Sequence, residues 1–157
     1  MIRKTCFFAF ITIVISCSTG EKEIHVDPEI IKLEESFIEK FKQNSGDAID
    51  FLTATNKWIG SFEMNLLKSK LDSITPELGK FQGFELISFR GIGNDYVLRS
   101  YLARYERQPL RFNLTFYRPT VRWQLQNIEF DFQIDEELKE SARVYRLNRN
   151  VLFEDHE

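Results

Sequence analysis

Two cysteines and two histidines are the side chains of this sequence best suited to metal binding or nucleophilic catalysis. The histidines are His25, in a polar stretch near the beginning, and His156, next to the last residue. A zinc site needs three or four ligands that the fold brings together, and a catalytic nucleophile needs a neighbouring base. Two histidines close to opposite ends of the chain supply neither arrangement. We therefore expect no metal, no cofactor and no histidine-based catalysis.

Cys17 stands at the end of a segment that looks like a secretory leader. Arg3 and Lys4 give the first residues a positive charge, and Thr5 to Ser16 is an uncharged apolar run. This run is too short to cross a bilayer, which takes about 20 residues, and the combination is typical of a signal peptide. The alternative is an uncleaved membrane anchor with two incidental cysteines, but the polar residues from Ser18 onward end the apolar run early.

Residues 14–17, Val-Ile-Ser-Cys, resemble the lipobox of bacterial lipoproteins. In that family the cysteine thiol receives a diacylglyceryl group, the signal is cut directly before the cysteine, and the new amino terminus is often acylated with a fatty acid such as palmitate. The resemblance implies that residues 1–16 are a signal peptide, that Cys17 carries lipid, and that residues 17–27 form a tether. It also implies an extracytoplasmic location at the inner or outer membrane of a bacterial envelope.

The composition of the remaining chain predicts one globular domain. Of 157 residues, 43% are hydrophobic and 14% aromatic, which is enough for a single core. Without Arg3 and Lys4, 19 basic residues face 24 acidic ones, a net charge of -5. This charge argues against nucleic acid as a partner and against electrostatic attraction as the membrane anchor. Cys6 falls in the signal and Cys17 carries lipid, so no thiol remains for a disulfide or a metal.

Helical periodicity dominates the first half of this domain. Asp27 followed by Pro28 favours a helix start, and Asn44-Ser45-Gly46 ends that helix. Further helices are expected over Asp47 to Thr53 and over Lys57 to Ser73. The residues expected to be buried on the third helix are Trp58, Ile59, Phe62, Leu66, Leu67 and Leu71.

Alternating patterns predict strands after Gly83. The expected strands cover residues 84–90, 96–107, 110–117 and 121–132, and a further helix and an acidic tail cover 135–157. The apolar phase of the last strand slips at Gln126-Asn127, where a β-bulge would keep both apolar sets on the core side. The inward residues of this sheet, from the second strand to the fourth, would be Leu98, Leu102, Leu110, Phe112, Leu114, Phe116, Val121, Trp123, Leu125, Ile128, Phe130 and Phe132.

This order predicts an α+β fold, with N-terminal helices packed on a bent four-stranded antiparallel sheet and a C-terminal helix added. The domain at residues 28–134 resembles the nuclear transport factor 2-like, or cystatin-like, superfamily, which implies a cone-shaped domain. The C-terminal segment, residues 135–157, is not required by the family pattern. The features that carry the resemblance are the capped first helix, the Gly46-Asp47 break, Leu78-Gly79-Lys80-Phe81 before the sheet, and a final strand built on Trp123 and Ile128.

Some members of that superfamily are enzymes, including ketosteroid isomerase, which uses an aspartate base in the mouth of the cone. Such chemistry needs an inward-facing titratable group in a pocket, and the inward residues expected here include no carboxylate or histidine. Tyr96 could donate a hydrogen bond into a cavity, whereas Asp95 is expected in a turn and Glu129 on the outward side. A small-ligand or isomerase- or dehydratase-type pocket is the alternative functional reading.

The opposite phase of the strands mixes arginine and tyrosine, as protein interfaces tend to do. From Glu85 to Leu125 the chain has seven arginines, no lysine and three acids. This phase could be a solvated sheet face, a docking face for an envelope protein or a second copy, or a surface for the protein's own acidic tail. We expect a binding or scaffolding role without catalysis. The candidate partner face consists of Arg99, Tyr101, Arg111, Asn113, Tyr117 and Arg122, with Thr115 and Gln124 on the same phase.

Overall fold

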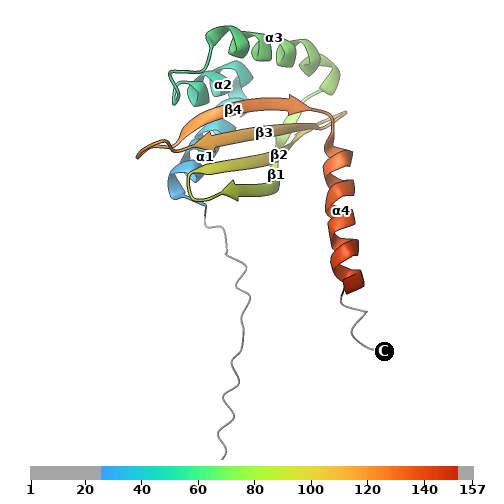
Figure 1. Cartoon of the computed structure of the whole chain (residues 1–157). Coiled ribbons are helices and arrows are strands. Elements are labelled where there is room, and N and C mark those ends of the chain that lie inside the picture. The colour runs from blue at the N-terminus through green and yellow to red at the C-terminus, as the bar shows by residue number, and fades with distance from the viewer. Residues whose placement is uncertain (1–25, 152–157) are drawn as a thin grey trace, which may run out of the picture.

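The computed structural model describes residues 26–151. The predicted signal peptide, Cys17, most of the predicted tether and residues 152–157 of the predicted acidic tail lie outside the described residues. The described chain has the predicted α+β fold, with helices, then a four-stranded antiparallel sheet, then a final helix (Figure 1). Its elements are α1 (Pro28–Gln43), α2 (Ser45–Thr53), α3 (Ser61–Leu78), β1 (Phe81–Ile92), β2 (Tyr96–Tyr105), β3 (Leu110–Tyr117), β4 (Gln124–Asp131) and α4 (Ile134–Val151).

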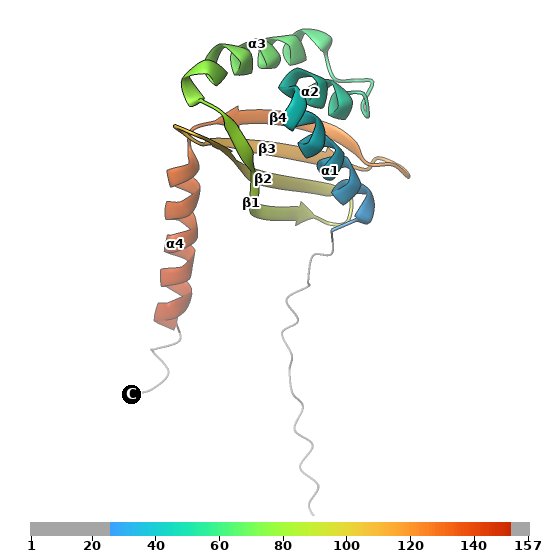
Figure 2. The same ribbon diagram turned by 180° about the vertical axis from the view of Figure 1, so that it is seen from behind.

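The sheet has one face that α1 and α2 cover and one that they leave open. Figure 2 shows α1 and α2 in front of the strands, whereas Figure 1 looks onto the opposite face, with these helices behind it. In both views α3 runs along the β4 side of the sheet, and α4 extends away from the end of β4. We call the side of α1 and α2 the inner face and the opposite side the outer face.

Local hydrogen bonds explain the limits of the first two helices. The Asp27 carboxylate accepts the Glu29 N–H at 2.9 Å and Pro28 lies in the first turn, as predicted. The Asn44 N–H donates to the Lys40 carbonyl at the end of α1, and the Asn44 side chain accepts the Asp47 N–H at 3.0 Å. One asparagine therefore ends α1 and caps α2, which is the predicted break between the two helices.

The third helix begins later than predicted because a turn precedes it. The side chain of Asn56 accepts the Trp58 N–H at 3.0 Å and donates to the Leu125 carbonyl at 2.8 Å. This arrangement holds the loop against β4, and α3 begins at Ser61 instead of Lys57. The helix then continues past the predicted end to Leu78, after which Gly79 adopts a positive φ of 82° that favours glycine.

The predicted burial of the third helix is right at one end and wrong at the other. Leu71 is fully buried, and Ile59 and Leu67 are partly buried against the core. Trp58 and Phe62 are instead 80% and 78% exposed, and Leu66 is exposed as well. Phe62 and Leu66 differ from the prediction because α3 lies beside the sheet, so only part of its apolar surface finds a partner, whereas Trp58 belongs to the loop before the helix.

The strands form an antiparallel meander in the order β1-β2-β3-β4. In β3 the predicted phase is confirmed, because its four apolar residues at alternate positions, beginning with Leu110, are fully buried. The predicted bulge in β4 is confirmed too: Asn127 pairs with Thr115 and Leu125 pairs with Phe116, so Gln126 is the extra residue. The bulge keeps both Leu125 and Ile128 buried.

Three of the residues predicted to face inward on the last strand, Val121, Trp123 and Phe132, lie beyond the ends of β4. Val121 belongs to the turn between β3 and β4 and is 82% exposed, and Phe132 follows the last residue of β4 and is about half exposed. The prediction fails at Val121 and Phe132 because the strand is shorter than the apolar pattern suggests. Trp123 and Ile128 are buried, as predicted.

The predicted phase of β2 is wrong. Arg99 and Tyr101 are 9% and 6% exposed on the inner face, where they pair across the sheet with Leu114 and Phe112. The leucines at 98 and 102 therefore lie on the outer face, opposite Thr115 and Arg111. Both phases of β2 carry apolar residues, so alternation alone does not show which phase faces the helices. The inward phase is the one that brings Arg99 to its partner, Glu34 of α1.

Aromatic rings fill the space between α1 and the sheet. Phe37 and Phe41 of α1 meet Phe84 of β1, with centroid separations of 5.7 Å and 5.0 Å. Phe112 of β3 lies within 5.5 Å of both Phe84 and Phe130. Tilted and edge-to-face contacts of this kind are the favourable geometries for aromatic pairs. The interior between α1 and the sheet is thus packed with side chains.

Candidate functional site

A buried ion pair lies on the inner face, where only uncharged side chains were expected from the strands. The Arg99 guanidinium donates to both oxygens of Glu34 on α1, at 2.8 Å and 2.9 Å. It also donates to the Tyr101 hydroxyl at 3.3 Å and lies 5.2 Å from the centroid of Phe89. Burial raises the pKa of the Glu34 carboxyl, and the positive charge of Arg99 offsets part of that effect. The prediction that the inward phase of the strands carries no titratable group is wrong, because Arg99 and Tyr101 lie on it.

This pair does not have the geometry of a general base. A base needs a carboxylate oxygen within reach of the substrate proton, but both Glu34 oxygens already accept hydrogen bonds from Arg99. The Glu34 side chain is only 5% exposed. The contact joins α1 to β2 across the inner face, so its evident role is structural.

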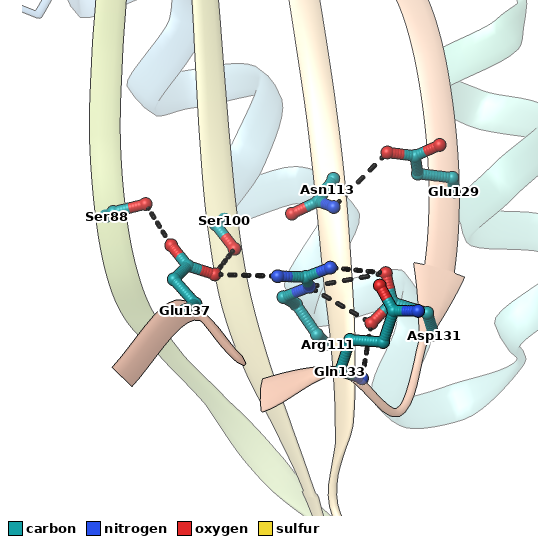
Figure 3. A network of polar contacts seen from close by, with 8 residues as sticks. All are labelled: Ser88, Ser100, Arg111, Asn113, Glu129, Asp131, Gln133 and Glu137. Carbon is teal, nitrogen blue, oxygen red and sulfur yellow. Dashed lines mark hydrogen bonds and ion pairs between the residues drawn. The ribbon is translucent and has the colours of Figure 1, made fainter. Parts of the chain in front are cut away.

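A second polar network lies on the outer face near the start of α4, and it contains two residues of the predicted partner face (Figure 3). Glu137, in the first part of α4, accepts the Ser88 hydroxyl at 2.6 Å and the Ser100 hydroxyl at 3.1 Å. The same carboxylate pairs with Arg111 at 3.2 Å. These donors come from three adjacent strands, so one side chain attaches α4 to β1, β2 and β3.

Arg111 is held from the other side by Asp131. The closest contact joins Arg111 Nη2 to an Asp131 oxygen at 2.8 Å, and the hydrogen bonds that Arg111 donates to Asp131 raise the pKa of Arg111. Asp131 also accepts the Gln133 N–H at 2.7 Å, which orders the turn into α4. Beside this group, Asn113 donates to Glu129 at 3.2 Å. Figure 3 shows these side chains on the outer surface of the sheet.

The structure therefore divides the predicted partner face into three parts. Arg99 and Tyr101 belong to the core, and their predicted exposure is wrong. Arg111 and Asn113 lie together on the outer face, where they contact acidic side chains of the same chain. Tyr117 and Arg122 are exposed at the end of the sheet where β3 turns into β4. Sequence alternation placed all six on one face because it assigned the wrong phase to β2.

The protein's own acidic tail, one of the occupants considered for the arginine-rich phase, ends at residues 154–157, which lie outside the described residues. The contact that the structure describes is a different one, between Arg111 and Glu137 of α4. The other acids singled out in the sequence lie where expected. Asp95 is in the β1–β2 turn, paired with Arg118 at 2.9 Å, and Glu129 is exposed on the outer face. Tyr96 is partly exposed at the same end of the sheet, against Tyr117.

Open grooves lie outside the core of the described residues. One, of about 690 Å³, separates the start of α2 from α3 and is lined mainly by polar groups, among them Asp50 and Lys68, which pair at 2.7 Å. Another, of about 360 Å³, lies between the α2–α3 loop and the end of the sheet, with Trp58 and Tyr117 in its walls. Within residues 26–151 no group of three or more histidine, cysteine or acidic side chains could hold a metal ion.

None of the helices in the described part of the chain combines the length and apolar character needed to cross a membrane. No protein-family model matches the chain, and no curated protein or solved structure matches it either.

Proposed function

We propose that this chain is a bacterial envelope lipoprotein, anchored through lipid on Cys17, whose α+β domain is a non-catalytic binding module. The lipobox-like residues 14–17 support the anchor, and the order of the elements supports a domain of the nuclear transport factor 2-like type. The proposed location is the outside of the cytoplasm, at the inner or outer membrane. The proposed partner is an envelope protein or a second copy of the chain.

One observation carries the binding role: α1, α2 and α3 leave the outer face of the sheet uncovered (Figures 1 and 2). The contacts from α4 to this face, among the described side chains, come from Glu137 near one end of the sheet. The rest of the face presents the polar side chains of Asn113, Asn127 and Glu129, together with partly buried apolar residues of β2, Leu98 and Leu102. An open sheet face with ordered polar side chains can form the direct hydrogen bonds that protein interfaces contain.

The packing of the inner face supports the proposal that the domain is non-catalytic. Aromatic rings occupy the interior, and the one carboxylate found there, Glu34, is already bound by Arg99. A small-ligand pocket requires an open concave site with convergent polar groups. The inner face lacks that arrangement in the described residues, so no observation favours the isomerase- or dehydratase-type alternative.

Site-specific photo-crosslinking in living cells tests the proposal. A photoreactive residue replaces Asn127, an exposed position on the outer face of β4, and in a matched strain it replaces Lys32, an exposed position on α1. We expect a covalent adduct from position 127 and none from position 32. The mass of the adduct distinguishes a second copy from another envelope protein. Equal recovery of adducts from both positions, or none from position 127, would contradict a binding role for the outer face.

A further inference from the structure

We propose that one end of the domain rests directly on the lipid bilayer that holds the anchor. This end, called the hairpin end here, consists of the β1–β2 turn (93–95), the β3–β4 turn (118–123), the residues beside these turns and the α2–α3 loop (54–60). The inference depends on the proposed lipid on Cys17 and adds a second contact, between folded protein and membrane. It leaves the outer face free for a partner.

The first observation is the exposure of large apolar side chains at this end. Val121 is 82% exposed, Trp58 80% and Ile92 77%. Tyr96 and Tyr117 are partly exposed beside them, with ring centroids 6.2 Å apart. Exposed apolar groups scattered singly are ordinary on a protein surface, but several at one end indicate an interaction site. Tryptophan and tyrosine are also the residues that concentrate at membrane–water interfaces.

The second observation is that these segments are joined to one another. The Arg118 N–H donates to the Asp95 carbonyl at 2.8 Å, and its guanidinium donates to the Asn94 carbonyl at 3.1 Å. These contacts fasten the β3–β4 turn to the β1–β2 turn. Trp58 and Tyr117 line the same groove of about 360 Å³, which places the α2–α3 loop beside them. The exposed apolar groups therefore belong to one surface of the fold.

The third observation is the position of the chain that leads to the proposed anchor. Arg118 pairs with Asp27, the cap of α1, at 2.9 Å, so the start of the domain is fixed at the hairpin end. Asp27 follows Cys17 by ten residues, and ten residues span at most about 36 Å when fully extended. The lipid would therefore keep this end of the domain, rather than the end that carries the β2–β3 turn, near the bilayer surface (Figure 1).

The charges at the hairpin end are compatible with a bilayer surface. Asp27 and Asp95 both pair with Arg118, which neutralises one of their two negative charges. Lys57, which lies over the Trp58 ring at 4.9 Å, and Arg122 are exposed. Basic side chains near a membrane surface are attracted to anionic lipid headgroups. Apolar contact is the main interaction of the hairpin end with the bilayer. Lys57 and Arg122 add local positive charge there, although the net charge of the whole chain is negative.

The experiment uses the full chain, lipid-modified in the cell and reconstituted into vesicles of phosphatidylcholine and phosphatidylglycerol. An environment-sensitive fluorophore is attached to the new thiol of Val121→Cys. Gln108→Cys, exposed in the turn between β2 and β3 at the other end of the sheet, is the matched control. Once Cys17 carries lipid it has no free thiol, so each variant has one labelled position. A second set of vesicles carries a quencher on the acyl chains.

We expect the acyl-chain quencher to remove more than about half of the emission at position 121 and little at position 108, because interfacial apolar groups lie at the boundary of headgroups and acyl chains. The two tryptophans give a second readout without a label. Trp123 is buried and Trp58 exposed, so acyl-chain quenching of tryptophan emission should disappear in Trp58→Phe.

Equal, weak quenching at positions 121 and 108 would overturn the proposal. Protection of position 121 from a water-soluble quencher, without quenching from the acyl chains, would also overturn it and would assign the hairpin end to a protein partner. Fatty-acid labelling of Cys17 in the same sample separates the two proposals. An unlabelled Cys17 contradicts the anchor and the membrane contact together, whereas a labelled Cys17 with an unquenched position 121 contradicts the membrane contact alone.

Discussion

At the scale of single residues, Phe112 lies at the centre of the aromatic core. It is fully buried, and its ring lies 5.4 Å from Phe41, 5.5 Å from Phe84 and 5.5 Å from Phe130. These neighbours come from α1, β1 and β4. Removal of this ring would leave a cavity that three different elements border.

We expect Phe112→Ala to lower the free energy of unfolding by about 3 to 5 kcal/mol, as truncations of buried aromatic residues do. Asn113→Ala, the adjacent position on the outer face, should change it little, because the Asn113 contact with Glu129 is exposed. Urea unfolding, followed by the fluorescence of the buried Trp123, compares the two. A larger loss from Asn113→Ala would mean that the phase of β3 is inverted.

The buried pair gives a second prediction. Glu34→Ala leaves the Arg99 charge inside the domain without its partner, a change that typically costs about 3 to 5 kcal/mol. The double replacement Glu34→Leu with Arg99→Met removes both charges and should be much less destabilising. The same urea measurement tests both variants. Additive losses in the double variant would contradict the assignment of this pair as a structural contact.

The Glu34–Arg99 pair also shows which kind of core contact could not be predicted from the sequence. Alternation predicts Leu110, Phe112 and Trp123 as core residues, because apolar side chains at alternate positions of a strand lie on the face that packs against the core. Arg99 was assigned to solvent, since a buried arginine requires a partner and Glu34 is 65 residues away in the chain. The same reasoning misplaced Tyr101. Long-range pairing of charges leaves no local signal.

At the scale of elements, Asp27 connects α1 to the hairpin end. Its carboxylate accepts the Glu29 N–H and pairs with Arg118. The hydrogen bond from Glu29, together with the positive charge of Arg118, holds the pKa of Asp27 below its ordinary value. Because the folded state lowers this pKa, the ionised group stabilises the fold above the unfolded pKa, and that contribution is lost as pH falls through the folded pKa.

We expect Asp27→Ala to cost about 1 kcal/mol at neutral pH, since it removes a helix cap and an ion pair. Asp27→Asn keeps a capping side chain and should lose less. The difference between the native protein and Asp27→Asn should shrink as the pH falls below the ordinary value of 3.8. The urea concentration at the midpoint of unfolding, measured for the native protein and for Asp27→Asn across this pH range, tests the expectation. A difference that is constant with pH would contradict the role of the Asp27 charge.

The attachment of α4 rests on Glu137. Glu137→Ala removes the acceptor of two hydroxyls and one guanidinium, and a hydrogen bond to a charged group contributes about 1.5 to 3 kcal/mol. We expect amide hydrogen exchange in residues 135–143 to become at least about tenfold faster. Glu136→Ala, at an exposed position on the same turn, is the control and should leave the rates unchanged. Equal rates in the two variants would show that other contacts hold α4.

Element boundaries were predictable where a residue has a local reason to end or bend the chain. The capping of α1 by Asp27, the break at Asn44 and the bulge at Gln126 all follow from short-range chemistry. The exposure of Phe62 was not predictable in this way, because helical spacing identifies an apolar stripe but does not say whether the helix packs on a sheet or beside it. The network around Glu137 was missed for a similar reason, since four separate elements build it.

At the scale of the whole molecule, the domain has two ends and two faces with different surroundings. The inner face is closed by α1 and α2, and the outer face is open for the proposed partner (Figures 1 and 2). The hairpin end carries the start of the domain and exposed apolar groups, while α4 leaves from the opposite end of the sheet. The fold class followed from the order of helical and alternating segments. The functional assignment depends on residues 14–17, the lipobox-like segment before the domain.

Both proposals depend on lipid at Cys17, so metabolic labelling with a fatty acid is the most direct test. The chain is expressed as the native sequence, as Cys17→Ala and as the matched control Ser18→Ala. We expect the native chain and Ser18→Ala to incorporate the label and to lose residues 1–16, because the thiol of Cys17 is the group that accepts the lipid. Cys17→Ala should show neither change. Persistent labelling of Cys17→Ala, or an unlabelled native chain, would contradict the lipoprotein assignment.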